Sequence, residues 1–273
     1  MTTPPRIDRR RALGLLAGAG AGAVVLGACG GGGGDPASGG SPTTTGGGGG
    51  SSPTTAGAAT TGTAGAAAPG AGALTAGDFG TASSCALTPE QTEGPYHLDV
   101  DQIRGDIRED RQGTPLRVAA RVVDADGCTP LKDAVFEIWH CDAGGLYSGF
   151  EAASRGTGGG GRGPVDDTRY LRGAQVTNAD GIAEILTIYP GWYQGRTVHI
   201  HAKVHLSNAE ALTTQLYFDD AVTDAAYRAA PYSSRPNRST RNDDDGIYRP
   251  QTTLTVSEDG DGFLGLITLA VRR

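Results

Sequence analysis

The stretch Thr197-Val-His-Ile-His-Ala-Lys-Val-His-Leu206 decides the fold, because this short run with β-branched residues predicts a strand. Side chains in a strand alternate between its two faces, so His199 and His201 project from the same side, about 7 Å apart along the backbone. The stretch therefore predicts β-structure and, on one face of it, two imidazoles that can converge on a metal ion.

Five further runs have the same character and are separated by turns rich in glycine, aspartate and proline. These runs are 117–124, 134–140, 173–177, 182–189 and 263–271. Helical periodicity is scarce, and one short helix is expected within 219–230. The pattern predicts an all-β fold, a β-sandwich of mostly antiparallel strands with long loops and little helix. A glycine-rich loop at 156–163 interrupts it and either lines the site or is an uninvolved excursion.

A tyrosine accompanies the histidine pair. Tyr193 lies six residues before His199 and follows the turn Pro190-Gly191, which can fold its phenol back toward the face of the histidines. A tyrosine, with a free pKa of about 10, ionises at neutral pH only beside a strongly acidic cation. Ferric iron is the natural candidate for such a ligand set, and zinc and copper stay open.

Neighbouring residues of the same types are expected to be structural. His205 shares the strand parity of His199, but six residues of strand separate the two by about 20 Å. Tyr189 precedes the turn and is expected to pack in the core, and His140, within a predicted strand, is expected to be structural.

The first 84 residues predict export and tethering. Residues 1–28 resemble a twin-arginine signal, with Arg9-Arg10-Arg11 before an uncharged apolar run. Leu26-Gly-Ala-Cys29 resembles a lipobox, which would make a lipidated Cys29 the mature N-terminus; an ordinary cleaved signal or a short membrane anchor are the alternatives. Residues 29–84 are rich in Gly, Ser, Thr and Ala and predict a disordered tether, because they bury too little apolar surface to fold. We therefore expect an exported protein, either a cell-surface lipoprotein or extracellular, whose functional domain spans 85–273.

Three cysteines lie in that domain, where an oxidising compartment would permit a disulfide. Cys128 and Cys141 flank a predicted strand that would hold them about 20 Å apart, too far for a bridge. The sequence favours a bridge from Cys85 to one of them over their mutual pairing, with three free thiols as the alternative.

The formal net charge of −7 argues against nucleic acid as a partner. No Lys/Arg cluster follows the signal, so contact with a membrane is expected only through a lipid anchor at Cys29.

Several motifs, in this order, resemble the intradiol ring-cleavage dioxygenases, non-haem ferric enzymes that open catechols. The motifs are Thr88–Tyr96, Glu137–Gly149, Leu171-Arg172-Gly173, Pro190-Gly191-Trp192-Tyr193, Arg196, His199-Ile-His201 and Gln215–Phe218. The resemblance runs from about Leu87 to the C-terminus. It implies a non-haem Fe(3+) cofactor, a catecholic substrate and O2, with cleavage to cis,cis-muconate-type products.

The resemblance also implies roles for individual residues. Four iron ligands are expected at Tyr147, Tyr193, His199 and His201, with Tyr193 leaving the metal to take up a substrate proton. Arg196 and Gln215 are expected to face the catechol ring, where a guanidinium stabilises developing negative charge; a surface salt bridge and a strand-edge hydrogen bond are their respective alternatives. Arg172 is expected to be a structural ion-pair residue, and Tyr96 and His97 to lie near the site mouth without a catalytic role.

Two rival functions stay open: a non-catalytic surface β-sandwich binding module, and a zinc or copper protein that uses the histidine pair. The sequence does not choose among catechol, protocatechuate and hydroxyquinol as substrates, and it does not indicate an oligomeric state.

Overall fold

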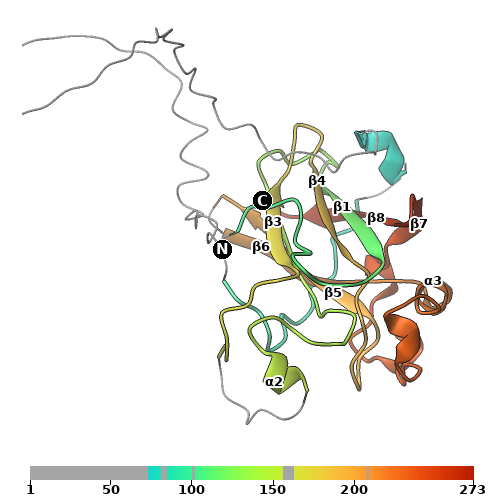
Figure 1. Ribbon diagram of the computed structural model, residues 1–273. Coiled ribbons are helices and arrows are strands. Elements are labelled where there is room, and N and C mark those ends of the chain that lie inside the picture. The colour runs from blue at the N-terminus through green and yellow to red at the C-terminus, as the bar shows by residue number, and fades with distance from the viewer. Residues whose placement is uncertain (1–72, 81–84, 100–101, 156–162, 208) are drawn as a thin grey trace, which may run out of the picture.

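The computed structural model describes residues 73–80, 85–99, 102–155, 163–207 and 209–273 (Figure 1). The predicted signal 1–28, the anchor Cys29, nearly all of the tether 29–84 and most of the loop 156–163 lie outside the described residues. No helix in the described ranges combines the length and the apolar character needed to cross a bilayer.

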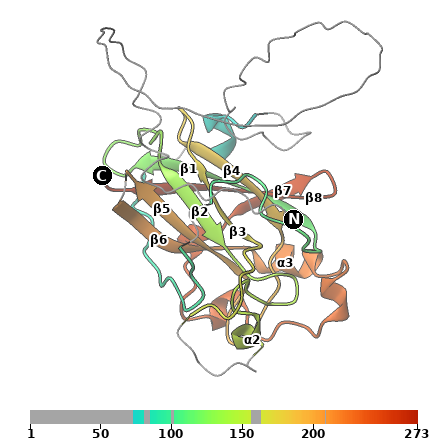
Figure 2. The ribbon, with the colours of Figure 1, turned by 60° about the vertical axis from the view of Figure 1, so that its left-hand side comes forward.

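Two four-stranded sheets form the body of the domain (Figures 1 and 2). The first has the order β4 (Ile182–Ile188), β1 (Pro115–Asp124), β8 (Gly262–Val271) and β7 (Thr255–Asp259). The second has the order β3 (Arg172–Val176), β2 (Val135–Trp139), β5 (His199–Leu206) and β6 (Ala209–Tyr217). Among these strand pairs only β1 and β8 run parallel, so the predicted, mostly antiparallel β-sandwich is confirmed.

The six predicted strands and the one predicted helix are all present, but two strands escaped prediction. The missed strand β6 begins Ala209-Glu-Ala-Leu212, residues that favour a helix over a strand. The missed strand β7 has only five residues and lies on an edge, with little buried apolar surface. Within the described residues helical structure is limited to short pieces: α2 (Glu151–Ser154), α3 (Asp220–Ala226), η1 (Ala76–Phe79), η2 (Tyr232–Ser234), η3 (Asn242–Asp244) and η4 (Pro250–Thr252).

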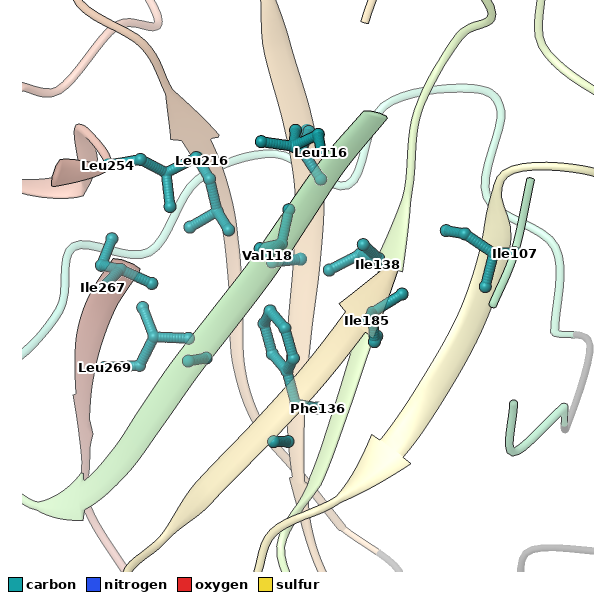
Figure 3. Close-up of a cluster of buried hydrophobic side chains, with 14 of the residues drawn as sticks. Ile107, Leu116, Val118, Phe136, Ile138, Ile185, Leu216, Leu254, Ile267 and Leu269 are labelled. Atoms are coloured by element: carbon teal, nitrogen blue, oxygen red, sulfur yellow. The ribbon is translucent and has the colours of Figure 1, made fainter. Parts of the chain in front are cut away.

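The hydrophobic core fills the space between the sheets (Figure 3). Alternate residues of β1, such as Leu116 and Val118, face Phe136 and Ile138 of β2, and all four side chains are fully buried. Burying one such side chain contributes roughly 1.5–3 kcal/mol. Because every second side chain of a strand points into this core, the intervening side chains lie on the outer faces of the sheets.

The turn η1 falls inside the stretch predicted as a tether, and it contacts β8. Leu74 and Phe79 are half-buried around it, and they supply the apolar surface that the preceding glycine-rich stretch lacks.

A disulfide joins Cys85 to Cys128, and Cys141 is a buried free thiol. The bridge confirms that Cys85 pairs with one of the two later cysteines and not those two with each other. It closes a separation of 43 residues and ties the chain before β1 to the β1–β2 connection.

Candidate metal centre

The centre lies on the outer face of the second sheet. In β5 the even-numbered residues, including Ile200 and Val204, belong to the core, which directs His199 and His201 to the opposite face. Both imidazoles are nevertheless buried, at 2% and 3% exposure. Other segments of the chain must therefore cover this face of the sheet.

Neighbouring strands support His201 on both sides. Trp139 of β2 and Gln215 of β6 are its direct cross-strand partners, so the three side chains form one row on the outer face. The Trp139 ring stacks on the His201 imidazole, with centroids 4.9 Å apart and planes 7° from parallel. Gly94 also approaches His201, so closely that a Cβ at this position would lie 3.1 Å from His201 Cε1.

Tyr147 reaches the centre through a tight turn after β2. The Asp142 carboxylate accepts hydrogen bonds from the amides of Gly144 and Leu146, at 2.8 and 2.9 Å. Gly145 has a φ of +85°, which a residue with a side chain adopts only with strain. The turn places Tyr147 fully inside the protein.

Tyr193 arrives on the second turn, which packs directly against the first. A Cβ at Gly191 would lie 2.4 Å from the Ala143 carbonyl oxygen, so only glycine permits this contact. The Gly191 amide donates to the Asp142 carbonyl oxygen at 3.1 Å. The docking leaves the Tyr147 and Tyr193 rings 5.8 Å apart, edge to face.

Four donor atoms meet where the turns reach β5. His199 Nε2 lies 3.0 Å from Tyr193 Oη, 3.5 Å from Tyr147 Oη and 3.2 Å from His201 Nε2. His201 Nε2 is 3.1 Å from Tyr147 Oη. The structure thus brings together all four side chains that the sequence selects as ligands.

The environment keeps all four groups neutral in the absence of a cation. Burial, reinforced by the charge of Arg196, lowers the pKa of His199 to about 3, and burial also lowers that of His201 well below its usual value. Burial raises the pKa of Tyr193 to about 12 and that of Tyr147 well above its usual value. Neutral imidazoles are the form that binds metals, whereas the phenols need a cation to ionise.

The donor set fits a metal ion. Ligand atoms about 2.1 Å from a shared ion, at angles of about 90–110°, lie about 3.0–3.4 Å from one another, which matches the spacing here. His199 Nδ1 faces the Thr197 carbonyl oxygen at 2.7 Å; this bond fixes the tautomer that turns the Nε2 lone pair toward the cluster. In the described ranges no three His, Cys, Asp or Glu side chains converge on one point, so a site here depends on the two phenols.

Comparison with known proteins places the chain in a family. The dioxygenase family model matches residues 88–233, more than half of the chain and all four clustered residues. The chain belongs to the intradiol ring-cleavage dioxygenases. An intradiol ring-cleavage dioxygenase from Tetranychus urticae is 35% identical, with a TM-score of 0.64 over 69% of this chain and 95% of that one.

Two further similarities describe its relation to the family. The dioxygenase domain of a dioxygenase carbohydrate-binding protein fusion from Streptomyces sp. SirexAA-E is 30% identical, with a TM-score of 0.51 over 68% of this chain and 98% of that one. The catechol 1,2-dioxygenase 1 of Acinetobacter lwoffii is 32% identical over 153 residues, 47% of this chain and 45% of the relative. The chain thus spans about half the length of this curated relative.

In this family member, Arg196 and Gln215 lie together at the edge of the cluster. Arg196 Nη2 donates to Gln215 Oε1 at 2.5 Å, and Arg196 Nε donates to the Asp245 carboxylate at 2.9 Å. Asp245 has a side chain only 2% exposed, so the ion pair is not the surface salt bridge that was the alternative for Arg196. Gln215 Nε2 donates to the Thr92 carbonyl oxygen at 2.8 Å and is fully buried.

Arg172 departs from expectation. It was expected in an ion pair, but the hydrogen bonds that its side chain donates in the described part of the chain go to neutral oxygens. Nε and Nη2 donate to the Ser148 hydroxyl and carbonyl oxygens at 2.8 and 2.7 Å. Its burial lowers its pKa to about 10. Arg172 thus anchors the residue that follows Tyr147, a contact that depends on folding β3 against the turn.

The histidines and the tyrosine that were expected to lie outside the cluster do so. His140 is buried between Thr187 Oγ1 and the Cys141 carbonyl oxygen, and Tyr189 is buried with its hydroxyl 2.8 Å from Thr223 Oγ1. His205 pairs with Glu137 at 2.9 Å, away from the cluster.

Tyr96 and His97 belong to the segment that covers the outer face of the sheet. The Tyr96 ring lies 4.8 Å from that of Tyr147, and the His97 ring lies 4.6 Å from that of Trp139.

Sequence reasoning missed three supporting residues: Asp245, Trp139 and Ser148. Trp139 could have been assigned to the outer face, because it alternates with Phe136 and Ile138 of the core, but its place beside the histidine strand depends on strand pairing. Asp245 carries no such signal, since it is one of three consecutive aspartates about 50 residues from Arg196.

Proposed function

We propose that this chain is a non-haem ferric enzyme that cleaves catechol-type aromatics between their hydroxyl-bearing carbons with O2, giving cis,cis-muconate-type products. The observation that carries the proposal is the cluster of two phenol and two imidazole donor atoms, each within 3.5 Å of another. The family membership and the catechol 1,2-dioxygenase activity named for the Acinetobacter lwoffii relative point the same way.

Tyr147, Tyr193, His199 and His201 would hold the ferric ion. The chemistry that the ion supplies when bound is Lewis-acid binding of both catechol oxygens and withdrawal of electron density from the ring. Two phenolates suit a hard trivalent cation better than zinc, whose usual protein ligands are thiolate, imidazole and carboxylate.

The two tyrosines differ in a way that suits different roles. Tyr147 is fully buried, whereas Tyr193 is only half-buried. Once away from the ion, the Tyr193 Oη would hold a proton firmly, because burial raises its pKa to about 12. The greater exposure of Tyr193 suits it to accept a proton from the incoming catechol, whereas the fully buried Tyr147 would remain a ligand.

Arg196 supplies a fixed positive charge beside the reacting ring. Its bonds to Asp245 and Gln215 hold the guanidinium in place, and its charge acts on both Tyr193 and His199. A preorganised cation stabilises negative charge that develops on the substrate without having to reorient during the reaction.

A visible spectrum of the purified domain loaded with ferric iron tests the proposal. Phenolate bound to ferric iron absorbs visible light, and anaerobic addition of catechol should shift that band to longer wavelength. Admission of O2 should then consume catechol and release a muconate-type product. A protein that binds iron without colour, or binds only zinc, would overturn the proposal in favour of a histidine-based metal protein or a binding module.

Tyrosine variants test the assignment of ligands. Tyr147→Phe and Tyr193→Phe should each lower turnover by at least 100-fold, the scale of losing one preorganised catalytic group. Tyr189→Phe is the matched control, because it removes a buried tyrosine hydroxyl outside the cluster. Near-full activity of both ligand variants would contradict the assignment.

We also propose that the chain is exported through the twin-arginine route and anchored by a lipid on Cys29. The Arg9-Arg10-Arg11 signal and the lipobox-like Leu26–Cys29 support this location, and so does the Cys85–Cys128 disulfide, since such bonds persist outside the cytoplasm. In cells that express the full chain, Cys29→Ala should move the protein from the membrane fraction to the soluble fraction. Retention of that variant in membranes would favour the short membrane anchor over the lipid anchor.

A further inference from the structure

The turn that carries Tyr193 is held at four successive backbone carbonyls. Each carbonyl oxygen of residues 189–192 accepts a hydrogen bond from a side chain elsewhere in the chain. The bonds are Tyr232 Oη to Tyr189 O at 2.6 Å, Tyr227 Oη to Pro190 O at 2.9 Å, Cys141 Sγ to Gly191 O at 3.3 Å and Arg235 Nη2 to Trp192 O at 2.9 Å. Three of the four donors lie in η2 or directly after α3 or η2.

Arg235 differs from the other three donors because it binds both tyrosine turns. Its Nη1 donates to the Ala143 carbonyl oxygen at 3.0 Å, in the turn that leads to Tyr147. Its Nη2 donates to the Trp192 carbonyl oxygen, which belongs to the peptide bond that begins Tyr193. The guanidinium carbon also lies 4.7 Å from the centre of the Trp192 ring, so the side chain is fixed in a third way.

We infer that Arg235 is a positioning residue that clamps the two tyrosine turns together and so sets the distance between the two phenols. The inference rests on the proposed function for the use of those phenols as ligands. Arg235 lies beyond residues 88–233, the part of the chain that the family model matches. A planar guanidinium suits the task, because its fork offers parallel donors to two acceptors at once, as a lysine ammonium does not.

The clamp acts mainly on Tyr193. Tyr147 has additional support, since its amide donates to Ser154 Oγ at 3.1 Å and its ring is fully buried. Tyr193 is half-buried and depends more on the position of its turn. Arg235 itself lines a cavity of about 470 Å³, so a shorter side chain there leaves room for water and causes no steric clash.

The first measurement uses the metal-free protein and hydrogen exchange. The Gly145 amide, bonded to Asp142 O at 2.9 Å, reports on the first turn, and the Gly191 amide, bonded to the same oxygen at 3.1 Å, reports on the contact between the turns. Arg235→Met should speed exchange at both amides by about tenfold or more, the scale of losing charged hydrogen bonds to the backbone. Arg228→Met, an exposed arginine just after α3, is the matched control and should exchange like wild type.

The second measurement is visible absorbance per bound ferric iron. Arg235→Met should lose about half of the band, because one phenolate of two is misplaced, and Arg235→Lys should fall between Arg235→Met and wild type. Should Arg235→Met fail to fold, Arg235→Lys carries the same comparison. A folded Arg235 variant whose amide exchange rates and absorbance per bound iron equal those of wild type would overturn the proposed role of Arg235. Faster exchange in Arg235→Met, with a wild-type protein that binds iron without colour, would leave the clamp standing and overturn the proposed function.

Discussion

The substitution Asp245→Asn tests how much of the centre depends on one buried carboxylate. Asp245 Oδ2 accepts from Arg196 Nε and from the Thr197 amide, both at 2.9 Å, and Oδ1 accepts from the Ile247 amide at 2.9 Å. Asparagine can keep the bond to Ile247 with its oxygen. Its amide nitrogen then faces two donors, so two charged hydrogen bonds are lost.

The expected loss of stability is about 3 kcal/mol. Each charged hydrogen bond contributes roughly 1.5–3 kcal/mol, and the removal of a buried charge that must be desolvated offsets part of the sum. Urea denaturation of the metal-free protein should show the midpoint about 1–2 M lower. Asp243→Asn, an exposed neighbour, should stay within about 0.5 kcal/mol of wild type.

Acidification should remove the difference between wild type and Asp245→Asn. Burial alone would raise the pKa of Asp245, but the hydrogen bonds from Ile247 and Thr197 and the charge of Arg196 outweigh it, so the net pKa lies below 3.8. A carboxylate with a lowered folded pKa stabilises the fold above its unfolded pKa and loses that effect as the pH falls through the folded pKa. The difference in unfolding free energy between wild type and Asp245→Asn should have its full size at pH 7 and pH 5 and should shrink below about pH 4. A difference under 1 kcal/mol at pH 7, or one unchanged at pH 3, would refute this reasoning.

Three further predictions concern the framework of the centre. Replacing Cys85 and Cys128 by serine should lower the free energy of unfolding by about 4 kcal/mol, the loop entropy of a 43-residue separation, and thermal unfolding with and without reductant measures it. Gly191→Ala should destabilise the domain by about 2–4 kcal/mol, because the new Cβ would lie 2.4 Å from a backbone oxygen, whereas Gly246→Ala, with open space around it, should be near neutral in the same denaturation assay. Burial lowers the pKa of His140 to about 4, so its neutral form favours the fold and the unfolded chain takes up the proton first as the pH falls below 6.5. Between pH 6.5 and pH 4 the unfolding free energy of wild type should therefore fall by about 3 kcal/mol more than that of His140→Gln, as denaturation at the two pH values measures. Equal losses in the two proteins would show that His140 titrates normally.

The sequence by itself determined the strands and the faces of their side chains. The alternation in 197–206 is a local property of extended backbone, so His199 and His201 were assigned to one face without knowledge of the partner strands. The glycine turns before Tyr147 and Tyr193 are also local. Similarity of the ordered motifs to one family then supplied the joint role of the four residues, which no single motif carries.

Only the tertiary structure decided which distant residues complete the centre. The pairing of Arg196 with Asp245, the choice of Cys128 over Cys141 and the bond from Arg235 to both tyrosine turns join segments 43 to 92 residues apart. No local pattern encodes such contacts, because they depend on how the sheets pack and where the connections between strands return. Backbone geometry therefore fixes the direction of each ligand, and the packing of remote segments fixes the distances between them.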